Sequence, residues 1–245
     1  MSARLTAPRI LRYLSSAIAA AVALPAAAVT VGYSQSFQSP ADSGDAATAY
    51  PEFTSTLNGG TATVVGGVLR LTGLGPSGTQ SDQLFTVSHS SAPSGELTFF
   101  GQIGASNSNG NYNVGMIIGQ NRLVFHPGFT AIPGAFRVEG PGGFGNTNMG
   151  FVPANGLLHQ FEIHSFPSGL FTIKVTDAGN PANVFNAQFT NLASYGAPFG
   201  FVRSGPAGAG AGDFDGRYDN LQIIPEPSAA GLFLLAGFGL VRRRR

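Results

Sequence analysis

The 245-residue chain contains no cysteine and no tryptophan. Without cysteine it can form neither a disulfide framework nor a thiolate metal site, so its folded body must be stabilised by a hydrophobic core. The segment from residue 29 to 224 is long enough for one all-β domain of this kind. The absence of tryptophan removes the aromatic side chain that most commonly stacks on sugar rings.

Positive charge is scarce between residues 29 and 224. This segment holds six of the 13 Lys and Arg residues but 11 of the 12 acidic residues, which gives it a net charge of about −5. The six cations are Arg70, Arg122, Arg137, Lys174, Arg203 and Arg217. They are dispersed along the chain, whereas nucleic-acid binding needs a clustered basic face. We therefore expect no nucleic-acid partner.

Motifs for catalysis are also missing. The chain has no Gly-x-Ser-x-Gly elbow and no glycine-rich loop followed by Gly-Lys-Ser/Thr. Glu96, Glu139 and Glu162 stand alone on separate predicted strands, whereas glycosidases need two carboxyl groups about 5 to 10 Å apart. His159 and His164 are five residues apart on one predicted strand, so they face opposite sides and cannot share a metal ion. These absences favour a protein that is not an enzyme.

The body has the pattern of β-strands throughout. Short runs rich in Val, Ile, Phe, Thr and Leu alternate with Gly, Pro, Asn and Ser, and no stretch keeps a helical period. Gly66-Gly67 and Pro167-Ser168-Gly169 predict tight turns between neighbouring strands. Between Leu157 and Phe166, apolar and polar residues alternate, which predicts a strand with one wet face. The predicted strands are Ala62 to Val65, Val68 to Thr72, Asp82 to Ser88, Glu96 to Ile103, Tyr112 to Ile118, Arg122 to His126, Phe136 to Glu139, Leu157 to Phe166, Leu170 to Asp177, Val184 to Thr190, Phe199 to Arg203 and Tyr218 to Ile224.

Strands of this number and length fit two stacked antiparallel sheets, so the predicted fold class is an all-β sandwich or jelly roll. The segments Leu158 to Ile163, Phe171 to Val175 and Tyr218 to Ile223 resemble the later strands of concanavalin A-like lectin and glucanase domains. The resemblance implies a concanavalin A-like fold and identifies no ligand. Glucanases of this type take their carboxylates from a Glu-x-Asp-x-Glu strand, which this chain lacks.

The N-terminal region has the pattern of a secretion signal. Three arginines precede an apolar stretch from Ala17 to Leu24, and Pro25-Ala26-Ala27-Ala28 follows with the small residues that signal peptidase accepts. We predict a signal peptide over residues 1–28, with cleavage after Ala28 and with Ala26 and Ala28 as the recognised positions. An amphipathic surface helix is disfavoured because the stretch from Ala17 to Leu24 has no polar face.

The C-terminal region combines three features in order: the tripeptide Pro225, Glu226, Pro227; an apolar run from Ala229 to Val241; and the cluster Arg242, Arg243, Arg244, Arg245. As a helix, the apolar run reaches about 20 Å, less than the roughly 30 Å of a bilayer core, so a permanent span is disfavoured. Positive charge after the run keeps the C-terminal end inside. The two prolines leave the tripeptide extended and accessible at the membrane surface.

This arrangement resembles the PEP-CTERM sorting signal of Gram-negative bacteria, over residues 224–245. The resemblance implies recognition and cleavage by an exosortase, transient contact with the inner membrane, and delivery to the cell surface or exterior in a setting of extracellular polysaccharide and biofilm. An ordinary tail anchor is the alternative, and it gives the Pro-Glu-Pro tripeptide no role. The predicted organisation is a signal peptide over 1–28, a β-sandwich over 29–224 and a sorting signal over 225–245.

One acidic cluster offers a candidate cation site. Asp213, Asp215 and Asp219 bring oxygen atoms close together along the sequence, as calcium requires. The spacing departs from the EF-hand pattern, and an Asp-Gly turn at Gly216 is the simpler alternative. Both interpretations stay open at this point.

The function predicted from these features is that of an exported surface or matrix protein whose non-enzymatic sandwich serves adhesion, glycan contact or matrix structure. Two polar segments are candidate sugar-binding loops, Asn107 to Asn113 with Tyr112, and Phe144 with Asn146 and Asn148, and each could equally be a plain exposed loop. The alternative function is a secreted glycan-acting hydrolase of concanavalin-like fold. Two carboxylates within about 10 Å on a concave sheet would favour that alternative.

Overall fold

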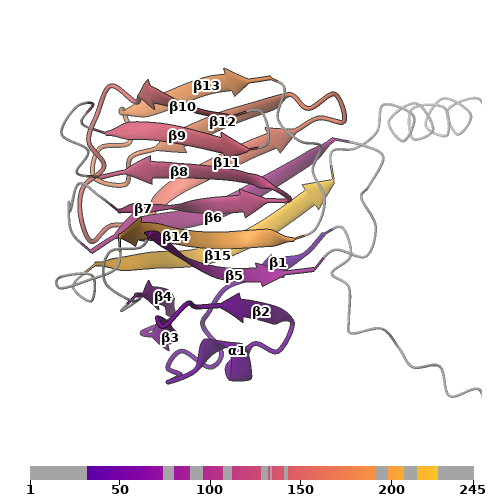
Figure 1. Ribbon diagram of the computed structural model, residues 1–245, viewed down its shortest axis with the longest axis vertical. Helices are drawn as coiled ribbons and strands as arrows, with labels where there is room; N and C mark the ends of the chain where they lie inside the picture. The colour runs from indigo at the N-terminus through magenta and orange to yellow at the C-terminus, as the bar shows by residue number, and fades with distance from the viewer. Residues whose placement is uncertain are drawn as a thin grey trace, which may run out of the picture.

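The computed structural model describes residues 32–73, 80–88, 96–106, 112–127, 132, 134–140, 143–190, 198–206 and 214–225. The predicted signal peptide with Ala26 and Ala28 lies outside these residues, and so do Asp213 and the chain from Glu226 to Arg245. Within the described ranges the chain forms fifteen strands and one short helix (Figure 1). Their bounds are β1 Ser34–Gln35, α1 Ala46–Ala49, β2 Phe53–Thr56, β3 Thr61–Val65, β4 Val68–Thr72, β5 Gln80–Val87, β6 Leu97–Ala105, β7 Asn113–Ile118, β8 Asn121–His126, β9 Ala135–Gly140, β10 Gly143–Asn148, β11 His159–Ser165, β12 Phe171–Thr176, β13 Val184–Phe189, β14 Phe199–Pro206 and β15 Asp215–Pro225.

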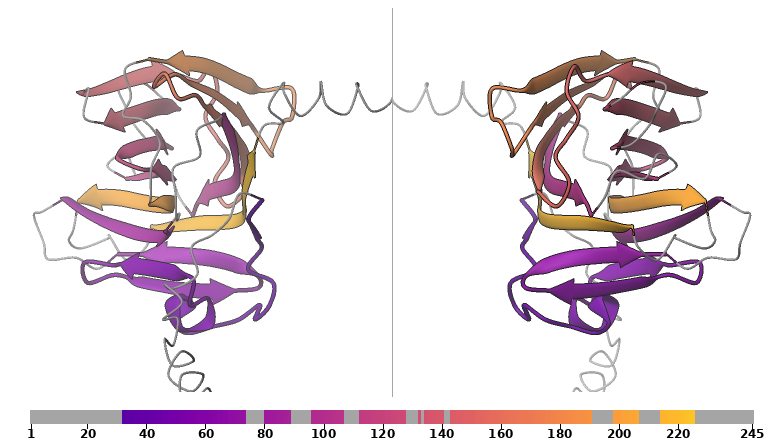
Figure 2. Two further views of the ribbon diagram at one scale, coloured as in Figure 1. Left: turned by 90° about the vertical axis from the view of Figure 1, so that its right-hand side faces the viewer. Right: turned by 90° about the vertical axis from the view of Figure 1, so that its left-hand side faces the viewer.

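The strands form two antiparallel sheets that pack face to face. The eight-stranded sheet has the order β13-β12-β11-β6-β15-β4-β3, with β1 paired to β15, and the seven-stranded sheet has the order β10-β9-β8-β7-β14-β5-β2. Figure 2 shows them as separate layers, most clearly in its upper half. The expected all-β antiparallel sandwich is confirmed. No helix within the described ranges combines the length and the apolar character needed to cross a bilayer.

Each of the twelve predicted strands is present. The Gly66-Gly67 turn between β3 and β4 has φ angles of 60° and 76°, and Gly169 between β11 and β12 has a φ of 79°. Left-handed values of this kind favour glycine, which explains why the sequence carries it at these turns. Strand β11 alternates buried residues with exposed or partly exposed ones, as its pattern predicts.

The sequence pattern misses β1, α1, β2 and β10. Strand β10 lies where the glycine-rich sequence is typical of a loop, but Gly143 to Asn148 pair with β9 residue by residue. Glycine and asparagine have low strand propensity. At the edge of a sheet, however, a strand needs only one partner, so pairing with β9 overrides the local preference.

Aromatic rings fill the space between the sheets. Phe53 and Phe85 stack with ring centroids 4.5 Å apart at one end of the core, and Phe125 and Phe161 stack at 5.6 Å near the other. Phe125 comes from the seven-stranded sheet and Phe161 from the eight-stranded sheet, so their contact joins the two layers. Burial of such large rings supplies the stabilisation that a chain without disulfides needs.

A polar clamp also joins the sheets. Arg203 on β14 is 1% exposed, and its Nε donates to the carbonyl oxygen of Phe214 at 3.2 Å. Its guanidinium carbon lies 5.0 Å from the centre of the Tyr112 ring. Tyr218 on β15 is fully buried, and its hydroxyl donates to the carbonyl oxygen of Val202 on β14 at 2.6 Å. The end of β14 is thus tied to the start of β15.

Three glycines leave room for this clamp. A Cβ atom at Gly73 would lie 2.2 Å from a guanidinium nitrogen of Arg203, one at Gly205 would lie 2.0 Å from the Tyr112 ring, and one at Gly216 would lie 2.2 Å from the Tyr218 hydroxyl. Contacts this short force the neighbouring groups to move.

We predict that Gly216→Ala lowers the free energy of unfolding by about 1–3 kcal/mol, because the added methyl group displaces a buried and hydrogen-bonded tyrosine. The change is measured by urea denaturation followed by far-UV circular dichroism, which reports the backbone and needs no tryptophan. Gly145→Ala, on strand β10, is the matched control, since a Cβ there meets no atom within 4 Å. Equal denaturation midpoints for the two variants would contradict the prediction.

Candidate functional site

The outer face of the eight-stranded sheet carries a groove of about 550 Å³. Strands β15, β6, β11 and β12 line it, because their residues alternate between the core and this face. Cross-strand pairing aligns one residue from each strand in a single row across the groove. In order, the row is Gln222, Phe100, Glu162 and Lys174, and it continues to Asn186 on β13.

Phe100 is an aromatic ring on a polar surface. Its neighbour Phe99 points into the core and is 2% exposed, whereas Phe100 is half-buried and lines the groove. The amide side chains of Gln102, Gln160 and Gln222 line the same groove. An apolar ring is thereby placed beside groups that both donate and accept hydrogen bonds.

A bulge in β15 directs a further amide into the groove. The register of β15 against β6 shifts between Asp219 and Gln222, and Asn220 has a φ of 52°. Bulges re-aim side chains in this way. The Asn220 Nδ2 donates to Gln102 Oε1 at 2.7 Å, and Asp219 Oδ1 accepts from the backbone nitrogens of Asn220 at 2.8 Å and Phe37 at 3.2 Å. These bonds hold the bulge in place.

A second groove of about 420 Å³ adjoins the first and shares Glu162 and Lys174 with it. Between the two, Lys174 Nζ lies 3.5 Å from Glu162 Oε2, and His164 Nε2 lies 3.0 Å from Glu162 Oε1. His164 Nδ1 lies 2.8 Å from Thr98 Oγ1. The charged groups of this surface are therefore already engaged with one another.

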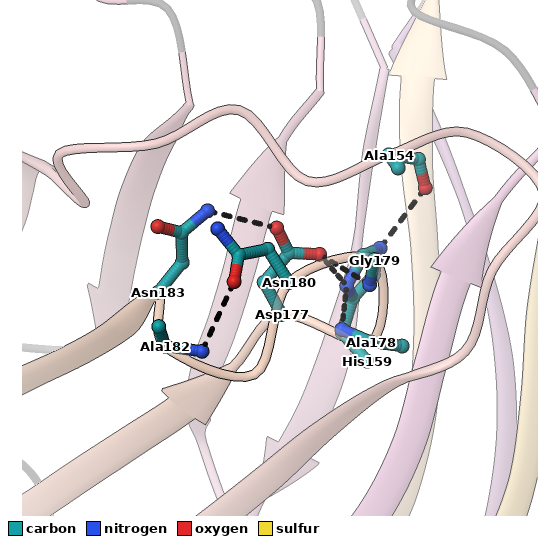
Figure 3. A network of polar contacts seen from close by, with 8 residues as sticks. All are labelled: Ala154, His159, Asp177, Ala178, Gly179, Asn180, Ala182 and Asn183. Atoms are coloured by element: carbon teal, nitrogen blue, oxygen red, sulfur yellow. Dashed lines mark hydrogen bonds and ion pairs between the residues drawn. The ribbon is translucent and has the colours of Figure 1, made fainter.

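A buried histidine on β11 organises the turn between β12 and β13 (Figure 3). His159 Nε2 donates to the carbonyl oxygen of Ala154 at 3.0 Å, and its Nδ1 accepts from the backbone nitrogen of Ala178 at 3.1 Å. Burial lowers the pKa of His159, and this outweighs the raising effects of the Ala154 carbonyl and of Asp177, whose Oδ1 lies 3.1 Å from Nδ1. We assign the ring as neutral and its role as structural.

Asp177 extends this network into the turn. Its Oδ1 accepts from the backbone nitrogen of Gly179 at 2.9 Å, and its Oδ2 accepts from Asn183 Nδ2 at 3.2 Å. The turn after β12 is therefore held at both ends, which fixes the start of β13. His159 and His164 face opposite sides of β11, as the sequence predicts.

The seven-stranded sheet carries a chain of ion pairs. Arg122 on β8 contacts Asp82 on β5 and Glu139 on β9, the latter at 3.4 Å, and Arg137 Nε lies 2.7 Å from Glu139. Since both carboxylates contact one guanidinium, they lie within about 10 Å of each other, the separation that glycosidases use. Both are engaged by Arg122, so neither is free in this arrangement to receive or deliver a substrate proton.

The structure describes two of the three residues of the predicted acidic cluster, Asp215 and Asp219. Asp215 and Gly216 belong to β15, so the Asp-Gly turn interpretation is wrong: pairing of β15 with β4 and β6 overrides the turn preference. Asp215 Oδ2 lies 4.0 Å from Arg70, and Asp219 is the residue that holds the bulge. Four residues along a strand separate Asp215 from Asp219 by about 13 Å. Among the described residues, no group of three or more His, Cys, Asp or Glu could hold a metal ion.

The structure describes only part of each of the two predicted sugar-binding loops. Tyr112 is 4% exposed and stacks on Phe214 in the core, with ring centroids 4.7 Å apart, so it is no surface platform. Residues 107–111 lie outside the described residues, as does the side chain of Phe144. Asn146 and Asn148 are exposed on β10. Sequence reasoning missed Phe100, although the alternation of Phe99 and Ile103 with Phe100 and Gln102 could have indicated its outward position.

Comparison with known proteins adds to the fold. No protein-family model matches the chain, and no curated protein matches it. Among solved structures, it is similar to peanut lectin with a bound nonapeptide, at a TM-score of 0.50 and 10% identity over 79% of this chain and 97% of that one. It is also similar to lectin II from Ulex europaeus, at 0.49 and 12% identity over 71% and 92% of the two chains. A glycosyl hydrolase family protein from Mycobacterium fortuitum gives 0.46 and 12% over 80% and 100%.

The likeness to peanut lectin, in which most of both chains takes part, defines the class of fold. The chain is a concanavalin A-like β-sandwich, as the sequence resemblance implies. At this level of identity the comparison shows the fold alone, and the ligand must be argued from the groove.

A buried histidine on β8 predicts acid sensitivity. Burial, and secondarily the positive charge of Arg137, lowers the pKa of His126 from 6.5 to about 4. As the pH falls, His126 takes up a proton in the unfolded chain before it does so in the folded one. The free energy of unfolding is therefore unaffected by His126 above pH 6.5 and falls by about 1 kcal/mol per pH unit between pH 6.5 and 4. Urea denaturation at pH 7 and pH 5 measures the loss.

His126→Gln should reduce that loss, since glutamine does not titrate. The control is Gln160→Ala, which changes an exposed residue on β11 and should leave the pH dependence unaltered. A His126→Gln protein with the full wild-type pH dependence would show that other groups cause it.

Proposed function

We propose that this protein is an exported, non-enzymatic glycan-binding protein whose binding surface is the groove around Phe100. The observation that carries the proposal is the placement of a half-buried aromatic ring among amide side chains in a groove of about 550 Å³. Ligand sites of this size pair an apolar surface with a few polar groups that fix orientation.

The chemistry of the groove suits a sugar. The apolar face of a pyranose ring packs on an aromatic ring, while its hydroxyl groups both donate and accept hydrogen bonds. Gln102, Gln160 and Gln222 each offer an amide oxygen and an amide NH₂ beside Phe100. Phenylalanine takes the place that tryptophan, absent from this chain, most often occupies.

The comparisons support glycan contact without naming a sugar. Peanut lectin, by its name a lectin, shares the sandwich. Since one fold hosts many functions, the proposal depends on the groove rather than on this likeness.

A hydrolase is the second candidate, and Asp82 with Glu139 is the observation that favours it. In that mechanism one carboxyl group would protonate the leaving oxygen and the other would act as nucleophile or base. Their engagement by Arg122 weighs against it. Release of reducing ends from a glycan by the purified protein, abolished by Asp82→Asn, would favour the hydrolase.

We predict that Phe100→Ala weakens glycan binding at least tenfold, because about 1.4 kcal/mol of stacking and burial is lost. The full chain is screened on a glycan array, and its ligands are then measured by calorimetry. Phe100→Tyr retains the ring and should retain binding. Val152→Ala, which changes a residue 48% exposed, is the control. Wild-type signals no higher than those of an unrelated sandwich domain would refute glycan binding.

Export and sorting form a separate part of the proposal. Signal peptidase would cleave after Ala28, and an exosortase would act at Pro225, Glu226 and Pro227. Pro225 is the last paired residue of β15, opposite Leu97. Cleavage beyond this point removes no strand of the described sandwich.

Mass spectrometry of the protein from its source cell, with and without the exosortase, tests this part. We expect a mature chain that begins at Val29, and loss of Arg242 to Arg245 only when the exosortase is present. An identical C-terminus in both cells would contradict exosortase processing.

Calcium binding at Asp213, Asp215 and Asp219 stays a prediction. Asp215 and Asp219 are too far apart to contact one ion along a regular strand, so binding would require β15 to rearrange at its start. Calorimetric titration with calcium, with a shift of the melting temperature as second readout, tests it. Absence of both heat and shift would exclude the site.

A further inference from the structure

We propose that the groove takes a linear, electrically neutral glycan that crosses five strands, and not a single sugar or an acidic chain. This inference rests on the proposed function and specifies the class of ligand. It depends on how the two grooves join and on the charges that line them.

The two grooves adjoin on one face of the sheet, and a ligand that occupies both passes over the Glu162–Lys174 pair. The first is lined from β15 through β6 and β11 to β12, and the second from β11 through β12 to β13. Glu162 and Lys174 line both. At about 4.8 Å between neighbouring strands, the path from β15 to β13 measures about 19 Å, longer than a single sugar ring.

The path crosses three rows of residues on the sheet. Besides the row that contains Phe100, the first groove is lined by Gln102, Gln160 and Thr176 in the row above it and by Ile224 in the row below it. The second groove is lined by the row below, with His164, Thr172 and Gln188. An extended chain that stacks on Phe100 therefore continues past Lys174 towards Gln188.

The charges along the path favour a neutral ligand. The cation of Lys174 is paired with Glu162, and Glu162 also contacts His164. An acidic sugar would have to break the Lys174 pair and approach the Glu162 carboxylate. The remaining groups are amides and hydroxyls, which match the hydroxyl groups of a neutral sugar.

Two exposed amide side chains, Asn186 and Gln188, line the far end of the path on β13. Their backbones pair with Lys174 and Thr172 of β12. Because a paired strand is already ordered, it presents these two amides without the ordering cost that an unpaired segment would add.

Calorimetry with oligosaccharides of defined length tests the inference on the full chain. The neutral probes are glucan, galactan and mannan oligosaccharides of one to six units, and the acidic probes are oligogalacturonides and alginate oligomers of the same lengths. We expect affinity for a neutral series to rise at least tenfold from two units to six, and every acidic series to bind more weakly. Equal affinity at all lengths, or tighter binding of an acidic series, would overturn the inference.

Variants at the two ends separate this inference from the proposed function. Asn186→Ala and Gln188→Ala should reduce the affinity for six units to the level of two units and leave the affinity for two units unchanged. Phe100→Ala should weaken both. Thr56→Ala, at an exposed position on β2 of the other sheet, is the control. If Phe100→Ala acts and the β13 variants do not, glycan binding stands and the extended path is wrong; if no probe binds the wild-type chain, both are wrong.

Discussion

The clamp formed by Arg203 and Tyr218 is the constraint on which the arrangement of the two sheets depends. A guanidinium that is 1% exposed must be satisfied where it lies, and the carbonyl of Phe214, the Gln83 side chain and the rings of Tyr112 and Phe214 surround it. Removal of these partners would leave a buried charge, which is among the largest destabilising effects known for single changes. The clamp therefore fixes β14 of one sheet against β15 of the other.

Strand β15 connects this clamp to the groove on the eight-stranded sheet. Its Tyr218 faces the core, and its Gln222 faces the groove on the opposite side. The bulge between Asp219 and Gln222 separates the two stretches and aims Asn220 at Gln102. Packing within the sandwich thus determines where the groove's amides lie, because β15 belongs to the clamp at its start and lines the groove at its end.

The sequence was informative where local pattern decides the structure, and uninformative where pairing between distant strands decides it. Alternating hydrophobicity was sufficient for all twelve predicted strands, whereas β10 and the start of β15 adopt strand structure against their local preference because partners lie beside them. Phe100 was missed because it directly follows another phenylalanine, and only the polar residues Thr98 and Gln102 on its side of the strand indicate which of the two rings points outward. The contact of Asp82 with Glu139 through Arg122 joins three separate strands, and no spacing in the sequence encodes it.

The position of Ile224 links the groove to the proposed processing of the chain. Ile224 lines the groove at its β15 end, is 41% exposed, and directly precedes Pro225. Under the proposed processing, cleavage just after Pro225 would therefore leave the new C-terminus at the β15 end of the groove, next to Ile224.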